Sequence, residues 1–184
     1  MKIRTGLSLV LVAGAALALG ACATLQRGPQ GNAAVPQPAK PVELERYLGR
    51  WYEQARYEAG FQKGCEAVTA DYSLRDDGLI RVLNSCRQDA VDGPLRTAEA
   101  KARIVDGSQN AKLKVSFFGP FYVGDYWVLD HADDYSWSIV GEPSGRYLWL
   151  LTREARPSEA ERQALRQRAR ELGYDLSLLR ETRH

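Results

Sequence analysis

The 184-residue sequence is poor in the residues that build most catalytic and metal centres. It has two histidines, His131 and His184, three cysteines, and a single methionine, the initiator. No Gly-x-Ser-x-Gly, His-Glu-x-x-His or phosphate-loop motif occurs, and no Cys-x-x-Cys pair indicates a zinc or redox site. The carboxylate pairs Asp76–Asp77 and Asp133–Asp134 lie in turn-forming segments, where aspartate is favoured for conformational reasons. We therefore predict no enzyme, no metal site and no cofactor.

The chain also lacks an excess of charge of either sign. Lys and Arg total 25 and Asp and Glu total 23, so removal of an N-terminal segment containing Lys2 and Arg4 leaves 23 of each (25 − 2 = 23). The basic run from Arg162 to Arg170 is typical of the solvated face of a helix. Without a basic stripe, the sequence predicts no nucleic-acid partner.

The apolar run from Leu7 to Leu19 is too short for an ordinary membrane-spanning helix, which needs about 20 residues. A basic start, this apolar stretch and the small residues after it describe a secretory signal peptide over residues 1–21. The ending Leu19-Gly20-Ala21-Cys22 resembles a bacterial lipobox, which implies cleavage before Cys22 and acylation of that cysteine. The alternative is an ordinary signal peptide with an incidental Cys22.

The remaining two cysteines, Cys65 and Cys86, form a pair for which a disulfide is the expected state in an oxidising compartment. Residues 22–41 are rich in Pro, Gly, Gln and Ala and show no apolar periodicity, which predicts a flexible tether. We expect the folded domain to span residues 42–184.

Within that domain, short runs of β-forming residues recur between turn signals. The turn Asp76-Asp77-Gly78 predicts a tight hairpin, because Asp and Gly tolerate positive φ. Sequential strands joined by short turns predict an antiparallel meander. The predicted strands are Trp51–Tyr57, Glu66–Leu74, Leu79–Arg87, Arg96–Val105, Lys112–Phe117, Asp125–His131, Ser136–Glu142 and Tyr147–Arg153.

Alternation along these strands predicts a closed sheet with an apolar interior. Ala98, Ala100, Ala102 and Ile104 alternate with charged or polar residues, so one face of this strand points inward and the other to water. Three small residues on one inward face favour a cavity, and the alternative is close packing of a neighbouring element against them.

One helix is expected after the strands. Ser158 and Glu161 form a capping box, a narrow apolar stripe follows, and Gly173 ends the helix. We expect this helix to pack outside the barrel, followed by a short final strand in the segment YDLSLLRE.

Three short motifs resemble the signatures of the lipocalin family, in particular its bacterial outer-membrane lipoprotein branch. The first is Gly49-x-Trp51 followed by Tyr52, and the second, a looser match, is Gly124-Asp125-Tyr126. The third is Arg153 at the end of the segment YLWLLTR. The resemblance extends from Val42 to about Glu181 and implies an all-β fold, an eight-stranded antiparallel up-and-down barrel with a C-terminal helix outside it.

This resemblance also implies how the barrel is closed. The first and last strands of a closed barrel are neighbours, so we expect Trp51 and Arg153 to meet at the closed end near Gly49. A guanidinium over an indole contributes about 0.5–2 kcal/mol. We assign these residues a structural role.

By the same resemblance, the protein binds and stores or transports a small hydrophobic ligand such as a fatty acid or lysophospholipid, without chemistry. Ala23 after Cys22 favours an anchor in the outer membrane, with the domain facing the periplasm. The alternatives are an envelope lipoprotein that acts through protein contacts and a lipocalin-type enzyme. The residues expected to face inward and contact the ligand are Phe117, Trp137, Ile139, Tyr147 and Trp149.

The loop from Phe117 to Gly124 is unusually aromatic for a connection between strands. A lid over the barrel mouth, a patch facing the membrane and a homodimer contact all fit this composition. Burial against the barrel rim is the fourth interpretation.

Overall fold

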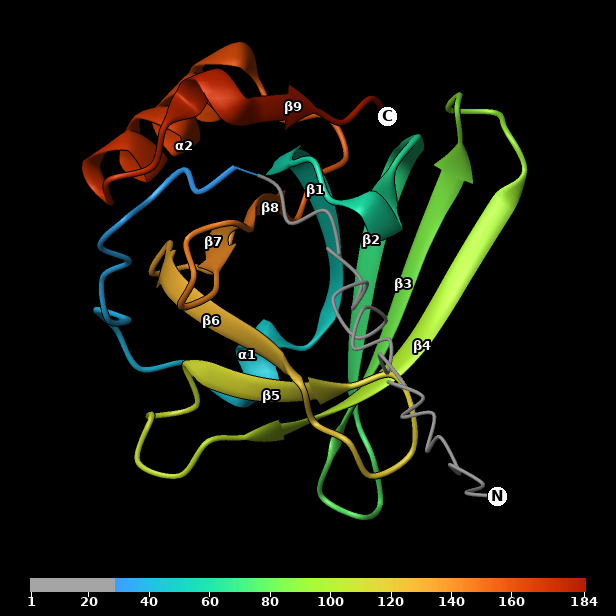
Figure 1. Ribbon diagram of the computed structural model, residues 1–184, viewed down its shortest axis with the longest axis vertical. Coiled ribbons are helices and arrows are strands. Elements are labelled where there is room, and N and C mark those ends of the chain that lie inside the picture. The colour runs from blue at the N-terminus through green and yellow to red at the C-terminus, as the bar shows by residue number, and fades with distance from the viewer. Residues whose placement is uncertain (1–28) are drawn as a thin grey trace, which may run out of the picture.

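The computed structural model describes residues 29–184, and residues 1–28, with the predicted signal peptide and Cys22, lie outside this description. The chain forms an antiparallel sheet that closes on itself, because β1 pairs with both β2 and β8 (Figure 1). Each of the eight predicted barrel strands is present, with bounds within two residues of those expected. The strands are β1 (Gly49–Tyr57), β2 (Cys65–Leu74), β3 (Ile80–Gln88), β4 (Leu95–Ile104), β5 (Lys112–Ser116), β6 (Gly124–His131), β7 (Trp137–Gly141), β8 (Leu148–Thr152) and β9 (Leu179–Glu181).

Successive barrel strands run in opposite directions, so their connecting loops divide between two ends. At one end, here called the closed end, the short helix α1 (Leu44–Tyr47) lies just before β1, together with the β2–β3, β4–β5 and β6–β7 loops. The opposite, open end carries the β1–β2, β3–β4, β5–β6 and β7–β8 loops. A short 3₁₀ helix, Gly60–Gln62, lies in the β1–β2 loop.

The predicted helix is α2 (Glu159–Glu171), and it packs outside the barrel (Figure 1). Ser158 and Glu161 form the expected capping box. Leu165 and Ala169 are buried in one cluster with outward-facing residues of β7 and β8. A second 3₁₀ helix (Leu176–Leu178) leads into β9, which pairs with β1 beyond the part of β1 that pairs with β2.

Residues 31–41 form an ordered strap along the outside of the barrel, seen in blue in Figure 1. The strap begins at the open end, where the Gly31 amide donates to the Gly145 carbonyl at 2.9 Å, and the Asn32 side chain donates to Leu172. It ends at the closed end, where the Val42 amide donates to Gln109. The expectation of a flexible tether up to residue 41 is therefore wrong for this part.

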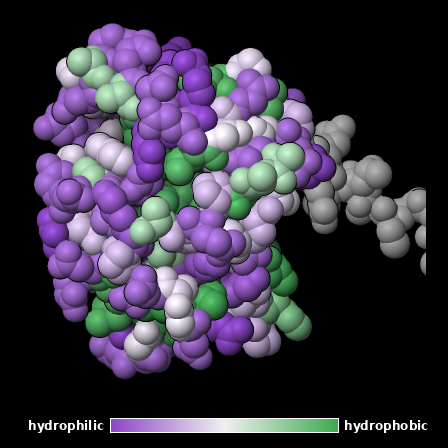
Figure 2. All heavy atoms as spheres, turned by 90° about the vertical axis from the view of Figure 1, so that its left-hand side faces the viewer, coloured by the Kyte–Doolittle hydropathy of each residue, from purple (hydrophilic) through white to green (hydrophobic). Residues whose placement is uncertain are grey.

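The strap fits tightly where it starts. A side chain on Gly31 would lie 2.2 Å from the Tyr57 ring, and the Asn32 side chain also accepts a bond from the Ala34 amide. These contacts come from individual residues, so composition alone did not reveal them. On the side of the molecule that carries α2 and the strap, hydrophilic residues predominate and hydrophobic ones form small groups (Figure 2).

The predicted disulfide between Cys65 and Cys86 is present and joins β2 to β3 near the open end. A cross-link of this span stabilises a fold by about 3 kcal/mol in the chain-entropy model. Within residues 29–184, no helix is long and apolar enough to cross a membrane.

Candidate functional site: a cup inside the barrel

The closed end is sealed by Trp51 and Arg153. Trp51 is fully buried, and the Arg153 guanidinium lies 3.8 Å from the centroid of its ring. The same guanidinium donates to the carbonyls of Arg50 and Arg46 at 2.7 and 2.6 Å, so it ties α1 to β1. Gly49 has a φ of 90°, a conformation that favours glycine, and lets the chain turn from α1 into β1 beside Arg153.

Above this seal lies a cluster of tyrosine hydroxyls. The Tyr47 hydroxyl is 2.9 Å from that of Tyr126 and 3.0 Å from the Ser138 hydroxyl, and Tyr72 donates to Tyr126 at 3.0 Å. Burial raises the pKa of Tyr47 to about 12 and also raises the pKa values of Tyr72 and Tyr126. The hydroxyls therefore stay protonated and satisfy one another inside the barrel.

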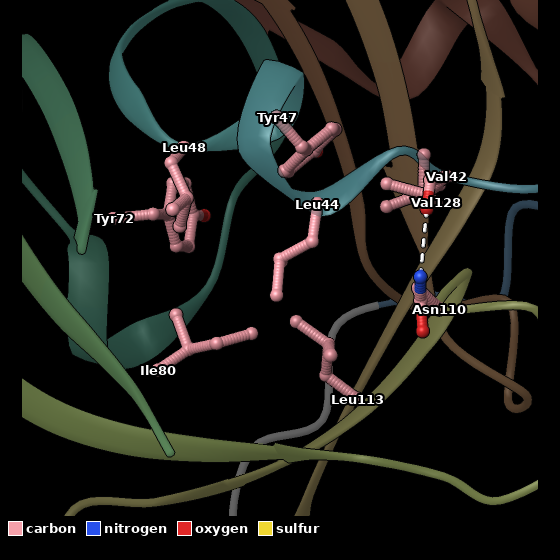
Figure 3. A pocket seen from close by; sticks show the side chains of 9 residues that line it. All are labelled: Val42, Leu44, Tyr47, Leu48, Tyr72, Ile80, Asn110, Leu113 and Val128. Carbon is pink, nitrogen blue, oxygen red and sulfur yellow. Dashed lines mark hydrogen bonds between the residues drawn. The ribbon is translucent and has the colours of Figure 1, made fainter. Parts of the chain in front are cut away.

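The closed half of the barrel is filled. Its small pocket between α1 and the strands leaves about 10 Å³ for the centre of a water molecule, which is room for about one water. Figure 3 shows Leu44, Ile80 and Leu113 converging on this space from different elements. This end is a packed floor and has no room for a ligand larger than water.

The inward face of β4 opens progressively toward the other end. Ala102 is fully buried, Ala100 is 6% exposed, and Ala98, the next inward residue toward the open end, is exposed. Burial of their partners on β3 also decreases toward the open end. Ile80 and Val82 are buried, and Asn84, opposite Ala98, is half-buried.

Four other strands repeat this gradient. In each, the inward residue near the floor is buried and the next one toward the open end is half-buried, as in Leu113 and Val115 of β5 or Leu151 and Trp149 of β8. The inward faces are therefore packed near the floor and exposed to water toward the open end, and we call this water-exposed upper part of the interior the cup. The upper inward residues that line the cup are Ala70, Asn84, Ala98, Val115, Tyr126 and Trp149.

A buried polar network forms one side of the cup beneath the β1–β2 loop. A β-bulge in β1 places both Glu53 and Arg56 opposite inward residues of β8, and their charges pair at 2.8 Å with Arg56 fully buried. The backbone carbonyl of Gln62 accepts a hydrogen bond from the Arg56 guanidinium, and the side-chain amide of Gln62 donates one to the Glu53 carboxylate. The Trp149 indole donates to the Gln62 side chain at 3.0 Å, which fixes the Trp149 ring in the wall.

The five predicted ligand contacts fall in three places. Trp149 lines the cup, and Tyr147 stacks on it at the open end with ring centroids 5.8 Å apart. Phe117 lies just beyond β5, with 47% of its surface exposed. Trp137 and Ile139 pair with outward residues of β8 and belong to the cluster under α2, so their predicted inward orientation is wrong.

The inward residues that the prediction missed were detectable in part. Ala98 stood in the alternating pattern, but Asn84 and Val115 were not proposed as ligand contacts although the same alternation places them inward. The position of Gln62 in the wall comes from the course of a loop, for which the sequence carried no signal. Among the described residues, no group of His, Cys, Asp or Glu side chains is arranged to hold a metal ion.

A closed antiparallel barrel with a sealed floor, a mostly apolar cup and one open end defines a class of small-molecule-binding barrel proteins. The chain belongs to the lipocalin-like family, because the model for the lipocalin-like domain matches residues 42–184.

Comparison with individual proteins agrees with this membership. The chain is 40% identical over 159 residues to the outer membrane lipoprotein Blc of Vibrio cholerae, covering 86% of this chain and 92% of that protein. It is 39% identical to Blc of Escherichia coli K12, covering 93% of each chain. Among solved structures, insecticyanin from the tobacco hornworm has a TM-score of 0.65 at 19% identity, covering 85% of this chain and 88% of that one, and shows the fold.

Proposed function

We propose that the protein binds a small hydrophobic molecule with an acyl chain, such as a fatty acid or lysophospholipid, in the cup. The gradient of exposure on the inward strand faces carries this proposal, because it identifies apolar surface that water reaches and a ligand would cover. Each CH₂ group moved from water into such a site contributes about 0.8 kcal/mol. Membership of the lipocalin-like family supports the same class of ligand.

The polar group of the ligand has a candidate partner in Asn84. Its side chain lies half-buried on the wall opposite Ala98, and none of the residues 29–184 forms a hydrogen bond with its amide. An amide donates to a carboxylate or phosphate and accepts from a hydroxyl. A head group near Asn84 leaves its acyl chain in contact with Val115 and Trp149.

We further propose that Cys22 is acylated and anchors the protein to the outer membrane, with the domain in the periplasm. The lipobox-like ending of the signal region supports this, as do the names of the Blc relatives as outer membrane lipoproteins. Cys22→Ala should release the protein from the membrane fraction, and a variant that stays there would contradict the anchor.

The binding proposal is tested by the ligand itself. Lipids extracted from protein purified out of its own membranes should include one acyl species in near-stoichiometric amount by mass spectrometry. Displacement of a fluorescent fatty acid should improve about fourfold for each added CH₂ until the cup is full. A protein that carries no lipid and shows no dependence on chain length would favour action through protein contacts instead.

A further inference from the structure

The exposed apolar side chains of this protein gather at one end of the barrel. Among the described residues, eight leucine, valine and phenylalanine side chains are exposed, and all except Leu74 lie in or beside loops of the open end. Leu74 is at the closed end, in the β2–β3 connection. The seven that form this apolar rim are Phe61, Val91, Leu95, Phe117, Phe118, Phe121 and Val123.

The β5–β6 loop is the most exposed part of the apolar rim and has a defined shape. Phe118, Phe121 and Val123 are 81%, 69% and 84% exposed. A bridge between Phe118 and Phe121 closes the loop into a tight turn, and the Ser116 hydroxyl donates to the Phe118 carbonyl. The loop thus holds its apolar side chains in water instead of folding them onto the barrel, which excludes the buried interpretation of this segment.

Two cationic side chains lie over the aromatic ring of Tyr122, which belongs to the same loop. The Arg103 guanidinium lies 4.8 Å from the centroid of the Tyr122 ring, and the Lys101 ammonium lies 5.8 Å from it, both on the outer face of β4. Lys101 and Arg103 pair with Ser116 and Lys114 of β5, so they lie on the barrel side of the loop. Exposed apolar residues in the loop with basic residues on its barrel side match the layers of a lipid surface, where acyl chains lie below phosphates.

The course of the chain brings the same end close to the proposed anchor. The strap starts at the open end, where Gly31 is bonded to Gly145 in the β7–β8 loop. Gln30 is the eighth residue after Cys22, and eight extended residues span at most about 28 Å. A barrel tethered to a membrane at Cys22 therefore has the start of its strap, at the open end, within that distance of the bilayer.

From these observations we infer that the apolar rim docks on the lipid bilayer with Phe118, Phe121 and Val123 inserted, so that the cup opens toward the lipid. The inference deepens the proposed function, because a lipid would then pass between bilayer and cup with little exposure to water. Only the limit on the distance between the open end and the bilayer depends on the anchor at Cys22. The composition and shape of the rim are independent of it.

The test measures which end of the barrel contacts lipid. The full chain is purified from membranes and reconstituted in vesicles of phosphatidylethanolamine and phosphatidylglycerol with brominated acyl chains, which quench tryptophan at contact. Phe118→Trp is compared with Leu74→Trp, since both add one tryptophan at an exposed apolar position, at opposite ends. We expect the fluorescence of the tryptophan added in Phe118→Trp to be quenched at least about threefold more strongly than that added in Leu74→Trp.

Other outcomes overturn the inference. Equal quenching of the two variants would mean that the open end has no preference for lipid. A concentration-dependent blue shift of Phe118→Trp without vesicles, with a doubled mass in ultracentrifugation, would identify the rim as a contact between two copies of the chain.

A second variant separates this inference from the proposed function. This variant combines Phe118→Ser, Phe121→Ser and Val123→Ser. In its background, the tryptophan added by Phe61→Trp should be quenched no more strongly than the one added by Leu74→Trp. The affinity for a soluble fluorescent fatty acid should be unchanged. If the unsubstituted protein binds no fatty acid but Phe118→Trp is still quenched more strongly than Leu74→Trp, the proposed ligand is contradicted and the docking of the apolar rim is supported.

Discussion

Two tryptophans of neighbouring strands differ in the face of the barrel on which they lie. Trp149 lines the cup, whereas Trp137 packs with the residues under α2. A ligand in the cup covers part of the Trp149 ring, and burial of an aromatic surface of this size is worth about 1.5–3 kcal/mol. We expect Trp149→Ala to weaken binding of a fluorescent fatty acid about tenfold or more in an equilibrium titration.

Trp137→Ala is the matched control for this prediction. It should lower the free energy of unfolding by about 1.5–3 kcal/mol, because the half-buried Trp137 ring packs on the cluster under α2, yet keep the affinity within about twofold. An equal loss of affinity in the two variants would show that the ligand does not lie in the cup.

Arg153 gives a prediction about stability alone. Lysine keeps the positive charge but cannot reach the Arg50 and Arg46 carbonyls and the Trp51 ring together, because it lacks the planar fork of donors. We expect Arg153→Lys to lower the free energy of unfolding in urea by about 2 kcal/mol. Binding in the cup should be unchanged, because the floor separates Arg153 from it.

Arg50→Lys provides the comparison for Arg153→Lys. Arg50 pairs with Asp71 on the barrel surface, with 56% of its side chain exposed. Exposed pairs contribute little, so the change should stay within about 0.5 kcal/mol. Similar losses in both variants would argue that Arg153 has no special part in sealing the barrel.

At the scale of elements, the orientation of a strand was predictable where one of its faces is exposed to water. The β4 alternation of small apolar and charged residues fixed its inward face, and the structure places those alanines on the interior. β7 is buried on both faces, by the interior and by α2, so Trp137 and Ile139 stand among apolar neighbours and alternation carries no orientation. For that reason, the prediction that Trp137 and Ile139 face the interior was wrong.

The same alternation patterns did not predict the positions of the loops and the strap. The strap is held by single hydrogen bonds and by the fit of Gly31 against Tyr57, and Gln62 enters the cup wall through the course of the β1–β2 loop. Such contacts join residues far apart in the chain, and neither periodicity nor composition encodes them. The barrel was therefore predictable and the contents of its wall only in part.

The end of the chain is fastened to β2 by Glu66, whose side chain is 4% exposed. It accepts bonds from Arg180 at 2.7 Å and from the backbone amide and guanidinium of Arg183. Burial alone would raise the pKa of Glu66, but the bonds from Arg183 and the charge of Arg180 outweigh it and lower the pKa below its ordinary 4.5.

This pKa direction predicts how Glu66→Gln depends on pH. A carboxylate with a lowered native pKa contributes stability that is complete above its unfolded pKa and is lost as the pH falls through the native value. Because both arginines are partly exposed, we expect the variant to lose about 1–2 kcal/mol at pH 7. The two unfolding curves should converge as the pH falls below 4.5, and a difference that persists there would contradict the ionic origin.

Glu99→Gln serves as the reference for that measurement. Glu99 is paired with Arg81 on the exposed face of the barrel, and its hydrogen bond with Arg81 also lowers its pKa. Its loss should have a smaller effect on unfolding at every pH, because both partners remain solvated. A larger effect than that of Glu66→Gln would mean that burial of the carboxylate is unimportant.

At the scale of the whole molecule, the cup and the stability of the barrel are linked through mass action. A ligand that binds only the folded protein, at a free concentration of 100 times its Kd, adds about 2.7 kcal/mol to the free energy of unfolding. For a domain of this size, that corresponds to a rise in Tm of about 5–10 °C. We expect a fatty acid at this ratio to produce such a rise in a thermal scan of the full chain.

The size of the rise at a fixed ligand concentration distinguishes a ligand in the cup from one bound elsewhere. Trp149→Ala should show only about half of it, because a tenfold weaker affinity leaves about 1.4 kcal/mol of stabilisation. Trp137→Ala starts from a lower Tm, since it loses packing under α2, but should gain the full increment. The same increment in both variants would place the ligand outside the cup, because of these two tryptophans only Trp149 belongs to the cup wall.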